Sequence, residues 1–277
     1  MQVHGIMILF TALLQNVLAQ TAQPFTKKLN KNKFYVYWGW NRDAYTDTDI
    51  RFHGTNYDFT LANVVAKDNQ APVGVDPYLA PLRVTIPQTN FRIGYFITDH
   101  WSLSLGLDHM KYVMVQDQTV DITGAINNTN TNYNGVYHDS PIKLTSEFLQ
   151  FEHTDGLNYI NAEVRRFDNL LELRRHKLPN IDINLTDGFG LGALLPKTNT
   201  TLLGNEQYDE FHLAGYGVSS FVGLNVTFFE YFFIQSELKG GYIYMPDIRT
   251  TMYKSDRAEE HFLFAQLNFL FGANFKL

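Results

Sequence analysis

The sequence contains no cysteine among its 277 residues. This absence excludes disulfide bonds, thiol catalysis and metal sites built on thiolates. It also excludes a lipid-modified cysteine at a mature N-terminus. Any attachment to a membrane must therefore come from the fold itself.

Charged residues are scarce, at 18% of the chain against about 25% in typical soluble domains. The formal net charge is −6, and the Arg and Lys residues are scattered among acidic ones. Because nucleic-acid binding needs a basic stripe or patch, we expect no nucleic-acid partner.

Long hydrophobic runs are missing as well, since no stretch of the expected mature chain approaches the ~20 consecutive apolar residues that a spanning helix needs. Apolar residues nevertheless make up 45% of the sequence, and 22 Phe, 16 Tyr and 3 Trp bring the aromatic fraction to 15%. Apolar content without long runs is typical of a β-barrel whose spanning strands alternate with a polar inward face.

The first segment has the pattern of an export signal. Residues 6–14 (IMILFTALL) form a short apolar core, and Val17, Leu18 and Ala19 supply the small residues of a cleavage site. The n-region departs from the pattern because it carries His4 but no Lys or Arg. We expect a signal peptide over 1–19, a periplasmic lead-in over 20–32 and a barrel domain over 33–277; the alternative for the first segment is an N-terminal helix.

The last segment has the clearest strand pattern. From His261 to Leu277 the odd positions are almost all apolar, whereas the even positions become polar or small toward the end. This period of two persists beyond the ~9–11 residues of a spanning strand. The same alternation recurs upstream and predicts eight strands, near 33–45, 88–98, 101–116, 157–168, 181–196, 210–228, 231–247 and 260–276.

The predicted connections differ in length. Short turns fall near 99, 169–180 and 229, whereas 46–87, 117–156, 197–209 and 248–259 form loops. Short periplasmic turns and longer outer loops are the usual asymmetry of outer-membrane barrels. The sequence therefore predicts an all-β fold, a closed antiparallel transmembrane barrel of about eight strands; 50–62 and 144–152 offer two further strands and a ten-stranded alternative.

The C-terminal segment FLFAQLNFLFGANFKL, the hairpin GYFITDHWSLSLGLDH and the signal peptide together resemble small outer-membrane β-barrel proteins of Gram-negative bacteria, those of the Bacteroidetes lineage in particular. The resemblance implies an outer-membrane location, contact with outer-membrane lipid and insertion by the outer-membrane assembly machinery. Such barrels often end on an aromatic residue, whereas this chain ends Phe275-Lys276-Leu277.

The strand alternation places six charged residues on the inward face: Arg92, Asp108, Glu163, Arg165, Glu237 and Lys239. An eight-stranded barrel is only wide enough to be filled with side chains. We therefore predict that these charges pair into a plug, which argues against a passive diffusion porin.

Two fragments at the outer rim carry the residues best suited to chemistry. His109 follows Asp108 on one strand, and Glu152, His153 and Asp155 lie near the start of the next. We expect the four side chains to converge. His109, His153 and Asp155 are the candidate catalytic residues, because a histidine polarised by an acid can activate a hydroxyl or water. Glu152, His153 and Asp155 are the candidate metal ligands.

The resemblance adds one further possibility, since small barrels of this kind include lipid A deacylases and acyltransferases that use a serine and a histidine at a rim or groove. Ser104 and Ser146 are the candidate hydroxyls here. Asn41, Arg42 and Asp43, at the outer end of the first strand, form a third polar cluster with no assigned role.

Three functions remain open at this point. The leading hypothesis is a non-enzymatic outer-membrane barrel with a structural, adhesive or interaction role. The second is an enzyme that modifies outer-leaflet lipid through the rim histidines. The third is a secreted lipocalin-like barrel that binds a hydrophobic ligand, which requires the apolar faces to point inward. The sequence identifies no cofactor and does not indicate the oligomeric state.

Overall fold

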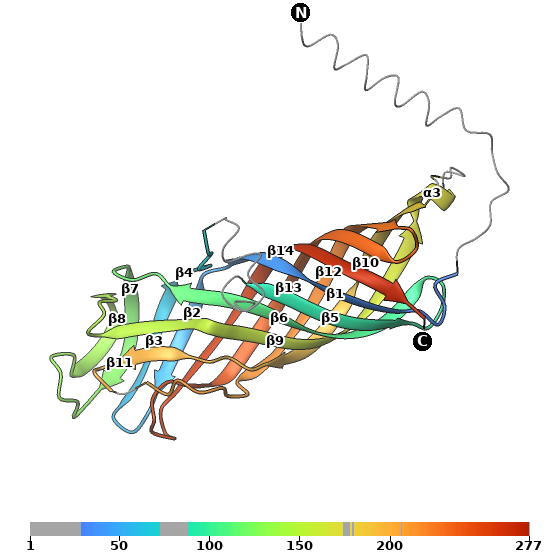
Figure 1. Cartoon of the computed structure of the whole chain (residues 1–277). Helices are drawn as coiled ribbons and strands as arrows, with labels where there is room; N and C mark the ends of the chain where they lie inside the picture. The colour runs from blue at the N-terminus through green and yellow to red at the C-terminus, as the bar shows by residue number, and fades with distance from the viewer. Residues whose placement is uncertain (1–28, 73–87, 174–177, 179, 206, 277) are drawn as a thin grey trace, which may run out of the picture.

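The computed structural model describes residues 29–72, 88–173, 178, 180–205 and 207–276 (Figure 1). The expected signal peptide and most of the expected lead-in, residues 1–28, lie outside the described residues. No helix in the described part of the chain is long and apolar enough to cross a membrane.

Nearly all the described elements are strands, as expected from the alternation in the sequence. They are β1 (Phe34–Tyr45), β2 (Thr48–His53), β3 (Tyr57–Val64), β4 (Ala66–Lys67), β5 (Thr89–Phe96), β6 (Trp101–Met114), β7 (Thr119–Ile126), β8 (Gly135–Lys143), β9 (Leu149–Asn169), β10 (Ile181–Leu194), β11 (Asn199–Leu202), β12 (Gly215–Phe228), β13 (Phe232–Arg249) and β14 (Arg257–Phe275). Among the described residues, one short helix, α3 (Leu170–Leu173), follows β9.

Eight of these strands close into an antiparallel ring in the order β1-β5-β6-β9-β10-β12-β13-β14. The ring closes where β1 pairs with β14, from Phe34 opposite Phe275 to Tyr45 opposite Phe264. These are the eight strands predicted from the sequence, so the all-β closed barrel is confirmed. The main boundary error is at β9, which begins at Leu149 instead of near residue 157.

The ten-stranded alternative is wrong. Residues 48–64 do form the hairpin β2–β3. Its one contact with a strand of the ring, among the described pairings, is between β2 and the outer end of β14, from His53 opposite Arg257 to Ile50 opposite Glu260. Residues 149–152 are the first part of β9. The hairpin therefore does not enter the ring; it starts a separate extension, β2-β3-β7-β8.

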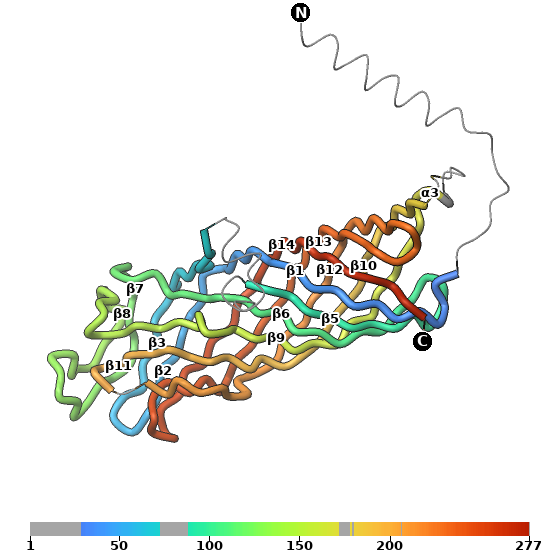
Figure 2. The backbone as a smooth tube through the Cα atoms, viewed as in Figure 1, coloured from blue at the N-terminus to red at the C-terminus, as the bar shows by residue number. Residues whose placement is uncertain are grey.

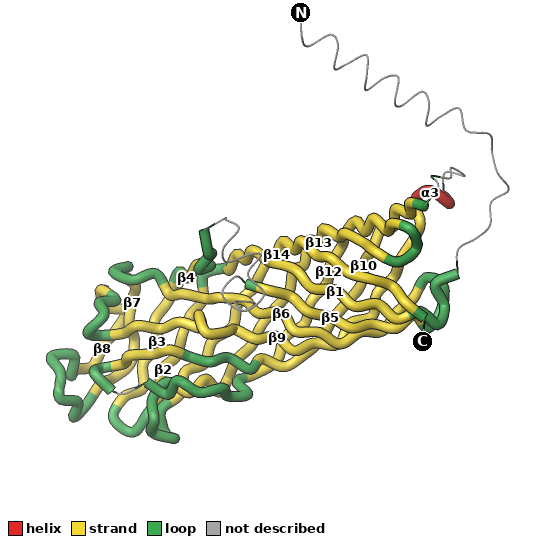
Figure 3. The backbone as a smooth tube through the Cα atoms, viewed as in Figure 1, coloured by secondary structure: helices red, strands yellow, loops and turns green. Residues whose placement is uncertain are grey.

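This extension projects beyond the ring at the end opposite to the C-terminus (Figures 1 and 2). The opposite end of the ring carries short turns, such as residues 97–100 between β5 and β6 and residues 229–231 between β12 and β13. Figure 3 shows strands running through most of the length of the molecule, with turns and loops at the two ends and further loop segments beside β4. Because outer-membrane barrels have short periplasmic turns, we assign the extension to the extracellular side.

The outer surface of the ring is an apolar belt. Its exposed large apolar side chains are Phe91, Ile93, Tyr95, Trp101, Leu103, Leu105, Leu107, Ile160, Val164, Leu185, Phe189, Leu191, Tyr216, Val218, Val222, Leu224, Phe232, Ile234, Leu238, Tyr242, Leu263, Leu267, Phe269, Phe271 and Phe275. A belt of this extent would be unfavourable in water but suits a hydrocarbon environment, in which a closed barrel leaves no unpaired strand edge. The ring is thus a transmembrane barrel of the bacterial outer-membrane type. The lipocalin alternative is wrong, since the apolar faces point outward.

The interior of the barrel has three layers. At the periplasmic end, six mostly aromatic side chains pack together: Tyr35, Tyr37, Phe96, Phe167, Phe233 and Leu270. A polar and charged layer fills the middle. At the extracellular end a large apolar core joins the ring strands to the extension, with Phe52 stacked on Phe59 and its edge against Phe151, each at 5.5 Å between ring centroids.

The belt predicts a strong position dependence for charged substitutions. Leu105 is 70% exposed near the middle of β6, so Leu105→Arg should lower the free energy of unfolding in lipid vesicles by about 2–4 kcal/mol. The matched change Leu213→Arg, at a 59% exposed side chain outside the strands, should cost about 1 kcal/mol or less. Urea titration of the two variants measures the difference, and equal small losses would contradict a lipid-facing Leu105.

Candidate functional site

The six inward charges predicted from the sequence all lie buried in the middle layer. Arg165 is the centre of the cluster. Its guanidinium donates to Glu163 from Nε and to Glu237 from Nη1, each at 2.6 Å. These are short, charge-assisted hydrogen bonds, which is the arrangement that offsets the cost of burying ions.

Lys239 and Arg92 complete the pairing. The Lys239 ammonium lies 2.7 Å from a carboxylate oxygen of Asp108 and 2.8 Å from one of Glu163. Arg92 lies 2.8 Å from Glu163 and 3.9 Å from Asp108. The three cations and three carboxylates therefore balance in charge, and each carboxylate contacts at least one cation.

Neutral groups satisfy the remaining donors of this charged plug. The Tyr37 hydroxyl accepts hydrogen bonds from Arg92 and Arg165, both at 2.9 Å. The Asn161 side-chain oxygen accepts from Arg92 at 2.6 Å. The guanidinium of Arg165 also stacks on the Phe221 ring, 3.9 Å from its centroid. The strand pattern identified the charges of the plug but not these neutral partners.

Small residues make space for the plug. A Cβ at Gly190 would lie 2.8 Å from the Ser219 hydroxyl and 2.9 Å from Cγ of Glu163. At Gly188, a Cβ would lie 2.7 Å from the Phe221 ring. Gly188 and Gly190 of β10 thus leave room for bulky neighbours in the lumen. The packed and ion-paired interior closes the barrel at mid-height.

The four rim residues predicted to converge do not share one site. His109 and Asp155 line a groove on the outer wall, whose other walls include Lys111, Asn158 and Lys197. His109 Nδ1 is 2.8 Å from the Asn158 side-chain oxygen. Leu107, Ile160 and Phe211 border the same groove, which therefore lies where the apolar belt meets polar side chains.

The groove carries opposite charges close together. The Lys197 ammonium lies 3.1 Å from the carboxylates of both Asp155 and Asp209. These hydrogen bonds raise the pKa of Lys197 above its ordinary value.

His153 points to the opposite side of the wall, into the interior, and is fully buried. Its Nε2 lies 3.2 Å from Glu260 Oε1, and its Nδ1 lies 3.1 Å from the Thr198 hydroxyl. The hydroxyl, imidazole and carboxylate have the order of a nucleophilic triad, but all three side chains are enclosed in the extracellular core, away from lipid and solvent.

Glu152 also has its own partners, accepting hydrogen bonds from Thr154 and Asn199. Glu152 and His153 are neighbours on a strand, so their side chains point to opposite faces of the barrel wall. The backbone of Gly156, with φ of +136°, then interrupts the alternation of faces along β9. Of the candidate hydroxyls, Ser104 is buried and accepts a hydrogen bond from Arg92, whereas Ser146 is exposed in the turn before β9.

Among the described residues, no group of three or more His, Cys, Asp or Glu side chains could hold a metal ion.

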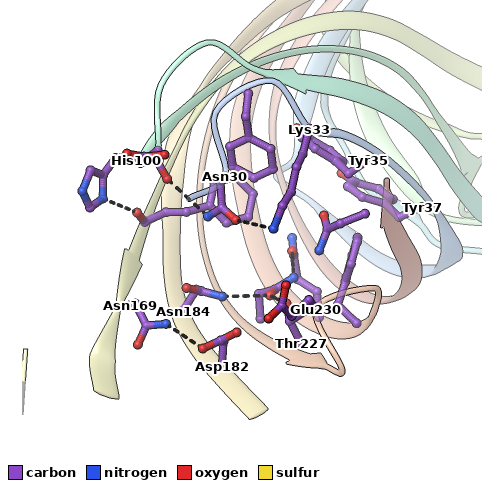
Figure 4. Close-up of a pocket in the computed structure, with 17 residues that line it drawn as sticks. Asn30, Lys33, Tyr35, Tyr37, His100, Asn169, Asp182, Asn184, Thr227 and Glu230 are labelled. Atoms are coloured by element: carbon purple, nitrogen blue, oxygen red, sulfur yellow. Dashed lines mark hydrogen bonds between the residues drawn. The ribbon is translucent and has the colours of Figure 1, made fainter. Parts of the chain in front are cut away.

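A polar pocket opens at the periplasmic end of the lumen (Figure 4). A chain of amides lines it: Asn184 donates to Asn225 at 3.3 Å, and Asn225 donates to Gln235 at 3.1 Å. Tyr35 and Tyr37, of the inner aromatic layer, also line the pocket. The pocket extends inward as far as the charged plug, because its lining residues Tyr37 and Gln235 contact Arg165 and Glu237. This pocket was not predicted from the sequence, although Asn184, Asn225 and Gln235 occupy polar positions in the strand alternation.

No protein-family model and no curated protein matches this sequence. Solved structures with a similar chain course are outer-membrane proteins. They include the attachment invasion locus protein Ail of Yersinia pestis, with 8% sequence identity, 88% of this chain and 99% of that chain covered, and a TM-score of 0.31.

Two other similar structures are the outer-membrane protease OmpT of Escherichia coli and Neisserial surface protein A. The protease has 8% identity, covers 90% of this chain and 99% of its own, and gives a TM-score of 0.26. Neisserial surface protein A has 10% identity, with 84% and 96% covered and a TM-score of 0.28. Similarity at this level assigns no activity to this chain.

The plug predicts a contrast between two adjacent arginines. Arg165→Met leaves Glu163 and Glu237 without their shared partner in a buried site, and should lower the free energy of unfolding by about 3–5 kcal/mol. Arg166→Met removes an exposed pair with Asp168 and should cost about 1 kcal/mol or less. Urea unfolding in vesicles measures both. Similar losses for the two variants would show that the buried pairs do not stabilise the barrel.

Proposed function

We propose that this protein is a non-conducting outer-membrane barrel that presents its extracellular β-extension to partners outside the cell. The plugged lumen is the observation that carries the proposal. Arg92, Arg165 and Lys239 and their carboxylates fill the mid-section of the barrel with buried ion pairs. A solute cannot pass without breaking this network, so transport is a poor explanation for the fold.

The extension supports an interaction role. Its strands β2, β3 and β7 contribute buried side chains such as Phe52, Phe59 and Ile122 to the extracellular core. The extension is therefore held to the barrel by apolar packing as well as by pairing with β14. Within the described chain, β8 pairs only with β7 and ends the sheet, and Val136 on it is 67% exposed. A free strand edge is a common place for another chain to add a strand.

The remaining parts of the proposal come from the sequence. A signal peptide over 1–19 would direct export, and the assembly machinery would insert the barrel, with outer-membrane lipid around the belt. Origin in the Bacteroidetes lineage rests on the sequence resemblance alone. An adhesive contact and a purely structural one both agree with a closed lumen.

Conductance tests the closed lumen. Protein refolded in detergent and inserted into planar lipid bilayers should show no steady channel current, because buried pairs block the pore. A porin inserted under the same conditions is the control for successful insertion. Discrete, stable channel openings by the wild-type protein would contradict the proposal.

Removal of the outermost hairpin tests the interaction role. Gln118 and Leu144 pair backbone to backbone, so an Asn–Gly turn can replace residues 119–143 and rejoin the chain there. Cells displaying this variant should settle together and attach to surfaces less than cells displaying the intact protein in equal amount. Unchanged mobility of the unboiled protein on a gel is the control for an intact barrel. Equal attachment would argue against adhesion.

The outer-wall groove supports the second candidate function, an enzyme acting on outer-leaflet lipid. His109 and Asp155 lie in this groove beside the apolar belt, whereas His153 has no access to lipid. If this candidate holds, lipid A from cells expressing the protein should lose or gain an acyl chain by mass spectrometry, and His109→Gln should abolish the change. Identical lipid A with and without the protein would exclude it.

A further inference from the structure

Two carboxylates at the extracellular end of the lumen differ from those of the plug. Asp43 on β1 is 8% exposed, and Asp68, half-buried, follows β4. The plug carboxylates contact Lys or Arg, but Asp43 and Asp68 form no ion pair with any described Lys or Arg. Lys111, on the outer face of β6, is attracted electrostatically to Asp68 and to Asp155.

The two carboxylates converge on a single atom. The side-chain nitrogen of Gln88 donates to Asp43 Oδ2 at 2.9 Å and also to Asp68 Oδ1. The backbone N–H of Asp43 donates to the other Asp68 oxygen at 3.0 Å. Like charges this close repel each other unless a positive group lies between them, and a neutral amide nitrogen supplies only part of that compensation.

The amide that joins them has an unsatisfied oxygen. Gln88 is fully buried, and its Oε1 has no hydrogen-bond partner. A second amide oxygen, Oδ1 of Asn41, is also buried and has none. Asn41 lies two residues before Asp43 on the same inward face of β1, and its backbone N–H donates to the Gln88 carbonyl at 3.3 Å. Orphaned buried oxygens of this kind call for a donor or a cation.

We propose that Asp43, Asp68 and Gln88, with Asn41 beside them, form a binding site for one calcium ion. A half-turn of the Gln88 amide exchanges its nitrogen and oxygen, which places Oε1 between the two carboxylates. The two orientations have nearly the same shape; without a cation the nitrogen faces the carboxylates, and with one the oxygen does. The site then offers two carboxylates and the Gln88 amide oxygen, with water completing the shell.

These ligands suit calcium better than magnesium. Calcium accepts six to eight oxygens in irregular geometry, whereas magnesium demands a near-regular octahedron and keeps most of its water. Asp43 is held on a rigid barrel strand, where the Gln266 side chain donates to its other oxygen at 3.0 Å. Asp68 comes from the connection that follows β4. The ion would therefore fasten this connection to the barrel wall at its extracellular end.

Calcium titration calorimetry of the full chain, refolded in detergent free of lipopolysaccharide, tests the site. The wild-type protein should bind one calcium ion per chain with a Kd of about 10⁻⁴–10⁻³ M, typical of extracellular sites. Asp68→Asn should weaken binding at least about tenfold, because it removes one of two charged ligands. Asp155→Asn, on the outer-wall groove, is the matched control and should bind calcium as the wild type does.

Three results would overturn the proposal. The first is that wild-type protein, shown to be folded by its unboiled gel mobility, binds no calcium. The second is that it binds magnesium as tightly as calcium or more tightly. The third is that Asp155→Asn loses calcium binding while Asp68→Asn keeps it. The last result would place the ion at the rim residues identified from the sequence. Because Asp68 is only half-buried and the change to Asn keeps its shape, the gel mobility of the variant should stay that of the folded barrel.

Discussion

The buried ion-pair network of the lumen is the constraint on which the rest of the structure depends. A ring of eight strands leaves an interior that side chains must fill, and lipid outside the ring leaves no place for charge except within. Arg165 and Lys239 therefore require Glu163, Glu237 and Asp108 at matching heights on neighbouring strands. Since a one-residue slip would turn each charge toward lipid, the same pairs favour a single register around the ring.

The three interior layers follow from this constraint. Within the membrane, polar groups have to satisfy one another, so the middle layer combines charges with Tyr37 and Asn161. Beyond the belt, the wall no longer faces lipid and the interior becomes apolar, which provides the packing surface for β2, β3 and β7. The same long strands thus form a membrane section filled by ion pairs and, at their extracellular ends, a second section with a hydrophobic core.

The ring could be predicted from the sequence because alternation is a local signal. Every second residue of β5, β6, β13 and the second half of β9 reports its face directly, and the six inward charges followed from this alternation. The extension could not be predicted so well, since the pairing of β2 with β14 joins segments about 200 residues apart. The rim site failed to converge for a local reason: adjacent residues such as Glu152 and His153 face opposite sides of a strand. The Asp43 cluster depends on Asp68 and Gln88, whose approach no spacing reveals.

The transmembrane barrel requires that the apolar faces of the ring strands contact lipid. The absence of cysteine makes a direct measurement simple, because a single cysteine can be introduced at Leu105 and carry a spin label in protein reconstituted into vesicles. If Leu105 faces lipid, dissolved oxygen, which concentrates in the hydrocarbon, should relax the label strongly, whereas a water-soluble nickel chelate should not. Strong relaxation by the chelate with little effect of oxygen would mean that Leu105 faces water, which would contradict the transmembrane barrel.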